Sequence, residues 1–201
     1  MKKTSNYRNL NYFDKLENID FYKFKKINEK LRINDIHRTK RFSFYDCSGT
    51  LSNGKEVIIE LKSRNYDLVN INNQYSCIKS IEYLDNNQTT FYNSLVIDLS
   101  KFSKLYSKLS NENEILYISF FKNNYISIFN FKDLQEAKIS ILNYYNIGKE
   151  KKQTNTLKVL LPISQSYIYK IDNNQYTLIQ SPLNKNNNSN INIKYSNEKY
   201  Q

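Results

Sequence analysis

The chain has 201 residues, and 30 Lys and Arg residues against 19 Asp and Glu residues give it a net charge of +11. Two cysteines and one histidine exclude a disulfide scaffold and the usual zinc-site spacings, and no apolar run approaches the ~18 residues of a membrane span. We therefore expect one domain in a reducing cytoplasm, with no membrane partner. The charge favours nucleic acid as a partner, although a composition rich in Asn and Lys is equally typical of an A+T-rich phage or bacterial genome.

The first third of the chain contains one predicted helix and two predicted strands. Apolar residues recur at helical spacing over residues 20–33, where Asp20 is suited to the N-cap position. Alternating apolar and aromatic residues then favour strands over 41–51 and 56–64. The intervening residues 52–54, Ser-Asn-Gly, are typical of a hairpin turn.

The remaining elements are predicted from the same periodicities and from the spacing of polar segments. In chain order they are an irregular segment at 66–88 with a short strand at 77–84, an amphipathic helix at 95–109, a hairpin of strands at 115–121 and 125–131, a third helix at 133–145, a polar linker at 149–155 and a short strand at 157–163.

This order of elements predicts an α/β or α+β fold around a mixed central sheet. We expect a single domain over residues 15–170, preceded by an N-terminal extension at 1–14. Residues 184–201 are rich in Asn and Lys and contain little that could be buried, so we expect a disordered tail there.

Charged residues interrupt the two strands around the predicted turn. Asp46 lies in the first strand, and Glu60 and Lys62 lie near the end of the second. Residues two apart in a strand point to the same face, so Glu60 and Lys62 share a face. Because burying an unpaired charge is costly, acids within apolar strands need a specific reason to be there.

The length of the turn decides whether the two acids meet. A two-residue loop at 53–54 pairs Asp46 with Leu61 and puts the acids on opposite faces of the sheet. A three-residue loop at 52–54, with its glycine in the left-handed conformation, pairs Asp46 with Glu60 and puts both acids on one face. The sequence leaves both alternatives open.

Two carboxylates opposite each other in a sheet repel unless a positive charge lies between them, and a divalent cation can provide it. Asp46, Glu60 and the Leu61 carbonyl would offer Mg²⁺ or Mn²⁺ the oxygen ligands that these ions prefer. Lys62 could then orient or deprotonate a water molecule, or stabilise charge on a phosphate.

The segment resembles the active site of the PD-(D/E)XK nuclease superfamily, in which an Asp on one strand is followed by Glu/Asp-x-Lys on the next strand of an αβββαβ core. The resemblance covers about residues 15–131, and Tyr45 replaces the proline of the family pattern. It implies a restriction-endonuclease-like fold and a Mg²⁺- or Mn²⁺-dependent deoxyribonuclease. Asp46, Glu60 and Lys62 would be catalytic, and Asp46, Glu60 and Leu61 would bind the metal. We expect DNA as the partner, a homodimer as an option, and no small-molecule cofactor.

Other residues are assigned from the same comparison. An acid on the first helix often takes part in this family, and Glu17 and Glu29 are both available. Cys47 is expected to be a small core residue rather than a nucleophile. Four basic residues near the motif are expected to contact nucleic acid, namely Arg38, Arg41, Arg64 and Lys101.

Two other interpretations stay open. Glu60 and Lys62 could belong to a solvated strand face, with Asp46 paired locally to a lysine. The same fold could also carry an inactive site and act as a non-catalytic nucleic-acid or protein interaction module. These alternatives differ in whether the carboxylates of Asp46 and Glu60 converge.

Overall fold

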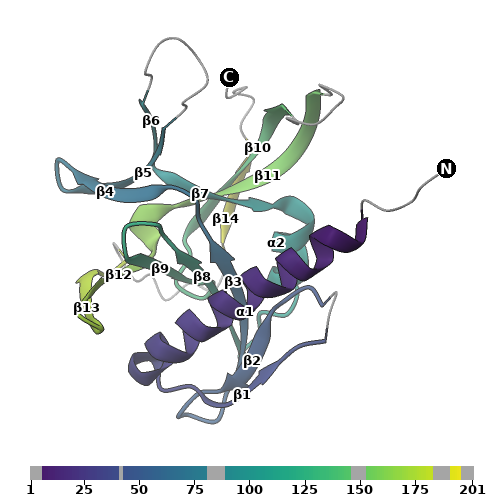
Figure 1. The fold of residues 1–201 in the computed structure, drawn as a ribbon, viewed down its shortest axis with the longest axis vertical. Helices are drawn as coiled ribbons and strands as arrows, with labels where there is room; N and C mark the ends of the chain where they lie inside the picture. Colours follow the sequence, from purple (N-terminus) through teal and green to yellow (C-terminus); the bar gives the residue numbers. More distant parts are fainter. Residues whose placement is uncertain (1–5, 41–42, 81–88, 146–152, 183–190, 196–201) are drawn as a thin grey trace.

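The computed structural model describes residues 6–40, 43–80, 89–145, 153–182 and 191–195 (Figure 1). The elements within these stretches are α1 (Asn6–Leu31), β1 (Asn34–Arg38), β2 (Cys47–Thr50), β3 (Glu56–Ser63), β4 (Asp67–Ile71), β5 (Gln74–Ser80), β6 (Thr89–Tyr92), β7 (Ser94–Asp98), α2 (Leu99–Tyr106), β8 (Asn113–Phe120), β9 (Tyr125–Asn130), β10 (Glu136–Tyr145), β11 (Gln153–Pro162), a 3-10 turn at Ile163–Gln165, β12 (Tyr167–Asp172), β13 (Gln175–Gln180) and β14 (Asn192–Tyr195).

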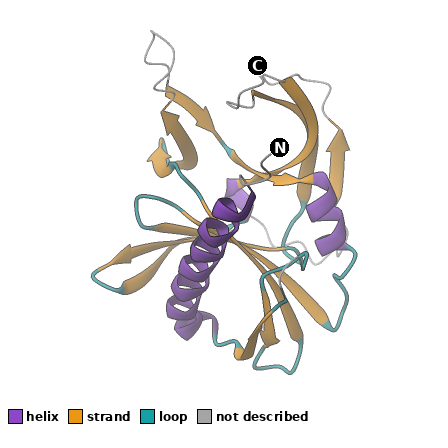
Figure 2. Ribbon diagram, turned by 45° about the vertical axis from the view of Figure 1, so that its right-hand side comes forward, coloured by secondary structure: helices purple, strands orange, loops and turns teal. Residues whose placement is uncertain are grey.

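The central sheet has seven strands in the order β1-β2-β3-β8-β9-β12-β13. Its β3–β8 pair is parallel and its other pairs are antiparallel, so the sheet is mixed as predicted. A second sheet has the order β14-β10-β11-β7, and a third the order β4-β5-β6. Helix α1 crosses one face of the central sheet, as Figures 1 and 2 show. The fold is therefore a mixed α+β fold.

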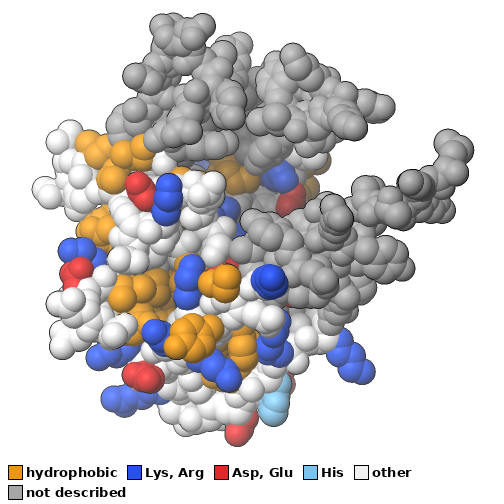
Figure 3. Space-filling model, viewed as in Figure 1, with side chains coloured by type: hydrophobic (Ala, Val, Ile, Leu, Met, Phe, Trp, Pro, Cys, Tyr) orange, Lys and Arg blue, Asp and Glu red, His pale blue; other side chains and the backbone are white. Residues whose placement is uncertain are grey.

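The α1 side of the central sheet is held by an apolar stripe on the helix. Phe24 and Ile27 are fully buried against Val57, Ile59 and Leu61, the odd-numbered residues of β3. Polar and basic residues cover the outer side of α1, and Figure 3 shows Lys and Arg side chains scattered over this face of the molecule. The strand therefore uses its odd-numbered side chains to anchor the helix.

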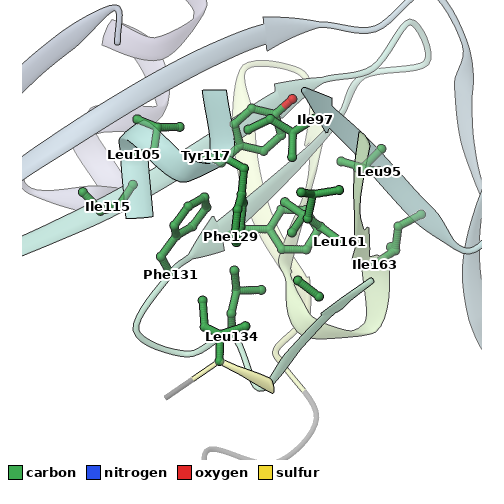
Figure 4. Packing of buried hydrophobic residues seen from close by; sticks show 14 of the residues in the cluster. Leu95, Ile97, Leu105, Ile115, Tyr117, Phe129, Phe131, Leu134, Leu161 and Ile163 are labelled. Atoms are coloured by element: carbon green, nitrogen blue, oxygen red, sulfur yellow. The ribbon is translucent and has the colours of Figure 1, made fainter. Parts of the chain in front are cut away.

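The opposite face of the central sheet packs against α2 and the second sheet. Phe102 and Leu105 of α2 lie in one buried cluster with Tyr117, Phe129 and residues of β7, β10 and β11. Figure 4 shows part of this cluster, with Leu95 and Ile97 of β7 and Leu161 of β11 directed toward the central-sheet aromatics. The even-numbered residues of β3 face this side.

The turn between β2 and β3 has three residues. The Leu51 amide donates to the Lys55 carbonyl at 2.8 Å, the Gly54 amide donates to the Leu51 carbonyl at 2.9 Å, and Gly54 has a φ of 81°. Cys47 consequently pairs with Ile59. These hydrogen bonds and this register confirm the three-residue alternative. Glycine suits position 54 because it adopts a positive φ without the steric cost of a side chain.

Helix α1 is longer than predicted. It begins at Asn6, so residues 6–14 belong to the helix rather than to an extension, and Asp20 lies in its interior instead of at its N-cap. The Asp20 carboxylate accepts a hydrogen bond from the Ser63 amide at 3.0 Å and another from the Ser63 hydroxyl. Asp20 is 8% exposed, so this contact is a buried polar link between α1 and the end of β3.

Two predicted elements are wrong in type, and one strand was not predicted. Residues 34–38, to which no helix or strand was assigned, form β1 at the edge of the sheet. The predicted helix at 95–109 begins as strand β7, and α2 starts only at Leu99. The predicted third helix at 133–145 is instead strand β10, which pairs with β11 and β14. In β7 and β10, pairing with neighbouring strands outweighs the helical pattern of the local sequence.

The remaining differences are in extent. The hairpin at 115–131 is confirmed as β8 and β9, the last predicted strand as β11, and the segment at 66–80 forms β4 and β5. Strands β12 and β13 continue the sheet past residue 170, and β14 lies within the predicted tail, of which residues 184–190 and 196–201 lie outside the described residues. Neither helix in the described part of the chain is long and apolar enough to cross a membrane.

Gly49 of β2 provides a test of the packing between β2 and β1. A Cβ at this position would lie 2.6 Å from Ile33 Cγ2 and 2.7 Å from the Asn34 carbonyl oxygen. Gly49→Ala should therefore lower the free energy of unfolding by about 1–3 kcal/mol, as overpacking does. Urea denaturation measures this change. Ser52→Ala, in the exposed turn, is the control and should stay within about 0.5 kcal/mol of the wild type; equal stability of the two variants would contradict the packing argument.

Candidate active site

Asp46 and Glu60 meet at the end of the β2–β3 pair. Asp46 immediately precedes β2, in which Cys47 pairs with Ile59, and its carboxyl group is near enough to Glu60 to raise the pKa of Glu60. The Asp46 amide donates to the Ile59 carbonyl at 3.0 Å, and its carboxylate accepts a hydrogen bond from the Leu61 amide at 2.7 Å. These two bonds hold the Asp46 side chain against β3, on the face that carries Glu60.

Glu60 is a buried carboxylate with one oxygen paired and one unpaired. The residue is 7% exposed, and its Oε1 lies 2.7 Å from the Lys101 ammonium of α2. Its Oε2 is buried with no hydrogen-bond partner. Because leaving a buried acceptor unsatisfied is costly, this oxygen needs either a proton or a bound cation as its partner.

The electrostatics of Glu60 agree with this geometry. Its pKa is raised to about 8, first because burial penalises the charged form and second because the Asp46 carboxylate is close. The Asp46 side chain also acts as a hydrogen-bonding partner that favours protonated Glu60, while the Lys101 ammonium lowers the pKa. The two carboxyl groups therefore converge, as the metal-site hypothesis requires.

Lys101 reaches the site because α2 follows directly on β7. Phe102 and Leu105 anchor the helix in the core, and Lys101 next to Phe102 points to β3. Asp98 at the helix start pairs with Lys158 of β11, which fixes the position where the helix begins. The structure thus brings Lys101, which was predicted as a nucleic-acid contact and as the second-helix residue that assists the site in the resembled family, into direct contact with a predicted metal ligand.

Lys62 and Leu61 lie at the open end of β3. Lys62 shares the face of Glu60 and is exposed, so its ammonium is accessible from solvent. The Leu61 side chain is buried against α1, whereas its amide points to Asp46. In an extended strand the amide and carbonyl of one residue point to the same side, so the Leu61 carbonyl also points toward the β2 side.

Arg64 has a role within the protein that sequence reasoning missed. Its guanidinium donates to the Tyr117 hydroxyl, to the Val96 carbonyl at 3.2 Å and to the Ser119 hydroxyl at 3.3 Å. These contacts tie β3 to β8 and β7 beneath Glu60. The nucleic-acid contact expected of Arg64 stays a prediction, and the guanidinium is engaged with the protein.

The other predicted basic and acidic residues are not brought to the site. The Arg38 guanidinium lies over the Phe21 ring, donates to Asn18 and is 3.9 Å from Glu17, so it packs on α1 at the opposite face of the sheet. Glu29 is exposed on α1. Arg41 lies outside the described residues.

The surroundings of Cys47 do not suit a nucleophilic cysteine. Cys47 is buried in the α1 cluster, and burial together with the Asp46 charge raises its pKa to about 12. A thiol with this pKa is neutral near pH 7 and is a poor nucleophile. Cys47 is therefore a core residue, as the sequence suggested.

The donor set limits which metals the site could take. Within the described residues, no three or more His, Cys, Asp or Glu side chains lie close enough together to hold a metal ion. Two carboxylates, one of them with an unpaired buried oxygen, fit a hard cation that keeps several water ligands, such as Mg²⁺ or Mn²⁺. They do not fit a structural zinc site, which needs four protein ligands.

Comparisons with protein-family models, with curated proteins and with solved structures each found no match. The functional argument consequently depends on the geometry of Asp46, Glu60, Lys62 and Lys101.

The raised pKa of Glu60 predicts a pH dependence of stability. The folded-state pKa of about 8 exceeds the ordinary value of 4.5, so between these values the folded state binds more protons than the unfolded state. The contribution of Glu60 to stability is thus complete below pH 4.5 and is lost as the pH rises through 8, at no more than about 1.4 kcal/mol per pH unit.

Glu60→Gln removes this titration. In EDTA, its melting temperature relative to the wild type should rise progressively between pH 5 and pH 9, which differential scanning calorimetry measures. Glu56→Gln is the matched control, because Glu56 is exposed on the same strand, and it should show no such trend. A constant difference between Glu60→Gln and the wild type across this range would contradict the assignment.

Proposed function

We propose that this protein is a metal-dependent nuclease that hydrolyses DNA phosphodiester bonds. The observation that carries the proposal is the convergence of Asp46 and Glu60 on one sheet face, with a buried, unpaired Glu60 oxygen and the exposed Lys62 beside it. A solvated strand face would not bury Glu60 or hold the Asp46 carboxylate on the Leu61 amide.

The topology supports the resemblance to the PD-(D/E)XK superfamily. Helix α1, the antiparallel strands β1, β2 and β3, helix α2 and strand β8 follow one another in the order αβββαβ, and β8 lies parallel beside β3. Strands β4 to β7 form an insertion between β3 and α2. The likeness lies in this order and pairing and in the motif, and it makes the restriction-endonuclease-like fold part of the proposal.

Each side chain has a role in the proposed reaction. Asp46, Glu60 and the Leu61 carbonyl would hold Mg²⁺ or Mn²⁺. The bound cation would neutralise charge on the phosphate and lower the pKa of a water molecule. Lys62 would orient or deprotonate the attacking water, or stabilise the phosphate. The water oxygen bonds to phosphorus, the bond from phosphorus to one ester oxygen breaks, and that sugar oxygen leaves with a proton.

Lys101 holds Glu60 in place before a cation binds. Its ammonium, 2.7 Å from Oε1, partly offsets the repulsion between the two carboxylates. The same contact favours a second function. Because Lys101 already forms an ion pair with Oε1 of Glu60, the chain could act without metal as a non-catalytic nucleic-acid or protein interaction module. Metal-dependent cleavage separates the two functions.

Three substitutions test the catalytic proposal. Asp46→Asn and Glu60→Gln should each abolish Mn²⁺ binding and DNA cleavage, because an amide is a poorer ligand than a carboxylate for a hard cation. Lys62→Ala should retain Mn²⁺ binding and lower the cleavage rate by about 10²–10⁴-fold. Calorimetric Mn²⁺ titration and plasmid cleavage with Mg²⁺, Mn²⁺ or EDTA measure both properties.

The control is Lys122→Ala, an exposed lysine in the turn between β8 and β9, which should cleave as the wild type does. Cleavage by Lys62→Ala at the wild-type rate would refute the role of Lys62. A wild-type protein that binds no divalent cation and cleaves neither plasmid nor linear DNA would refute the nuclease and favour the interaction module.

A further inference from the structure

A pocket opens at the edge of the central sheet, where β1 ends and β2 begins. It has a volume of about 520 Å³ and is open to solvent. The two chain segments that form it are joined by the Thr39 amide, which donates to the Asp46 carbonyl at 3.0 Å. Its lining residues are His37, Arg38, Thr39, Lys40, Ser43, Tyr45 and Ser48.

The strand register puts this pocket on the same face of the sheet as the candidate active site. His37 pairs with Ser48 across β1 and β2, and Cys47 pairs with Ile59 across β2 and β3. Directly paired residues share a face and alternate residues along a strand share a face. Ser48 also pairs with Ile58, two residues before Glu60, so His37 and Ser48 lie on the face of Glu60.

The pocket is also close to the site along the chain. Tyr45 in its wall directly precedes Asp46, and the Thr39 hydroxyl donates to the carbonyls of Tyr45 and Asp46. Ser48 is two residues beyond Asp46, which is about 7 Å in an extended strand. A ligand that bridges the pocket and the carboxylate pair thus needs to span only a short distance.

The chemistry of the lining favours an anion. Lys40 and His37 are exposed, and the hydroxyls of Ser43 and Ser48 add hydrogen-bond donors. None of the residues that line the pocket in the described part of the chain is acidic. The Arg38 guanidinium is turned to α1, so Lys40 supplies the positive charge and the His37 ring adds a hydrogen-bonding group.

We propose that this pocket binds a backbone phosphate of the nucleic acid, next to the phosphate that lies at Asp46 and Glu60. The inference rests on the proposed nuclease function and extends it by naming the residues that position the substrate. Phosphate contacts from lysine and hydroxyl side chains fix the register of a nucleic acid without reading its sequence. The pocket therefore positions the strand for cleavage and gives no sequence specificity.

The test uses a 5′-fluorescein-labelled DNA duplex in EDTA, where no metal-dependent cleavage occurs. Fluorescence anisotropy over a range of NaCl concentrations gives the affinity and its salt dependence. Lys40→Gln should weaken binding about 5–20-fold and reduce the slope of log K against log[salt] by about 1, as expected for one lost phosphate contact. His37→Ala should weaken binding in the same direction.

Lys30→Gln is the matched control, because it removes the same charge from an exposed position in the last turn of α1, on the other face of the sheet. It should change the affinity by less than about 2-fold and leave the slope unchanged. Equal losses in Lys40→Gln and Lys30→Gln would overturn the proposal, because the pocket would then contribute only net charge. Melting temperatures equal to that of the wild type exclude unfolding as the cause.

The outcomes also separate the pocket from the nuclease. In a cleavage assay with Mn²⁺, Lys40→Gln should raise KM more than it lowers kcat, since a positioning contact acts on ground state and transition state alike. If the wild type binds DNA through Lys40 but cleaves no DNA with any of the metals, the nuclease proposal is refuted and the proposal of phosphate binding by the pocket is supported. If the wild type cleaves DNA and Lys40→Gln has an unchanged KM, only the proposal of phosphate binding by the pocket is refuted. Binding of an acidic peptide in place of DNA would overturn the nucleic-acid assignment.

Discussion

The hydrogen bond from the Leu61 amide to the Asp46 carboxylate holds two acidic side chains beside each other at the end of a strand pair. This arrangement is unfavourable for the isolated protein, because like charges repel and Glu60 is buried. The rest of the site compensates for it. Lys101 approaches from α2, and Arg64 fixes the strands beneath Glu60. A hydrophobic side chain at position 60 would be buried at lower cost than this carboxyl group.

Successive side chains of strand β3 face opposite sides of the central sheet and have different surroundings. Its odd-numbered apolar side chains pack on α1, and Ser63 at its end donates hydrogen bonds to the buried Asp20 carboxylate. Its even-numbered residues include Glu60 and Lys62, which face the other side. Because α1 fixes one face of β3, the face that carries Glu60 and Lys62 is also held in position.

The predictions that succeeded depended on local physics. Gly54 in a Ser-Asn-Gly turn carries the information on loop length, because a left-handed glycine completes a three-residue hairpin. The acidic pair and Lys62 followed from this register. The alternation of apolar residues in β8 and β9 was equally clear, because both strands are buried and rich in β-branched residues.

The predictions that failed depended on contacts distant in sequence. Glu136, Ala137 and Lys138 favour a helix, yet β11 and β14 supply strand partners on both sides. Asp20 was placed at a helix start because it is a good N-cap residue, although it precedes Phe24 by four positions and so lies on the apolar stripe. The position of Asp20 on the apolar stripe of α1 could have predicted that its side chain is buried against the sheet. The contact of Lys101 with Glu60 needed the position of α2, which no local pattern provides.

The parallel pairing of β3 with β8 has a consequence for how the protein is made. Strands β2 and β3 leave the ribosome first and carry both carboxylates with them, whereas Lys101 and the strand that covers β3 are synthesised later. Parallel pairing of distant segments also forms slowly, because loop closure precedes the contacts that reward it. The β2–β3 hairpin, which contains both acids, is therefore complete in the chain before the Lys101 partner of Glu60 and before strand β8. Glu60 gains its ion pair with Lys101 and its neighbouring strand β8 only after both segments have been synthesised.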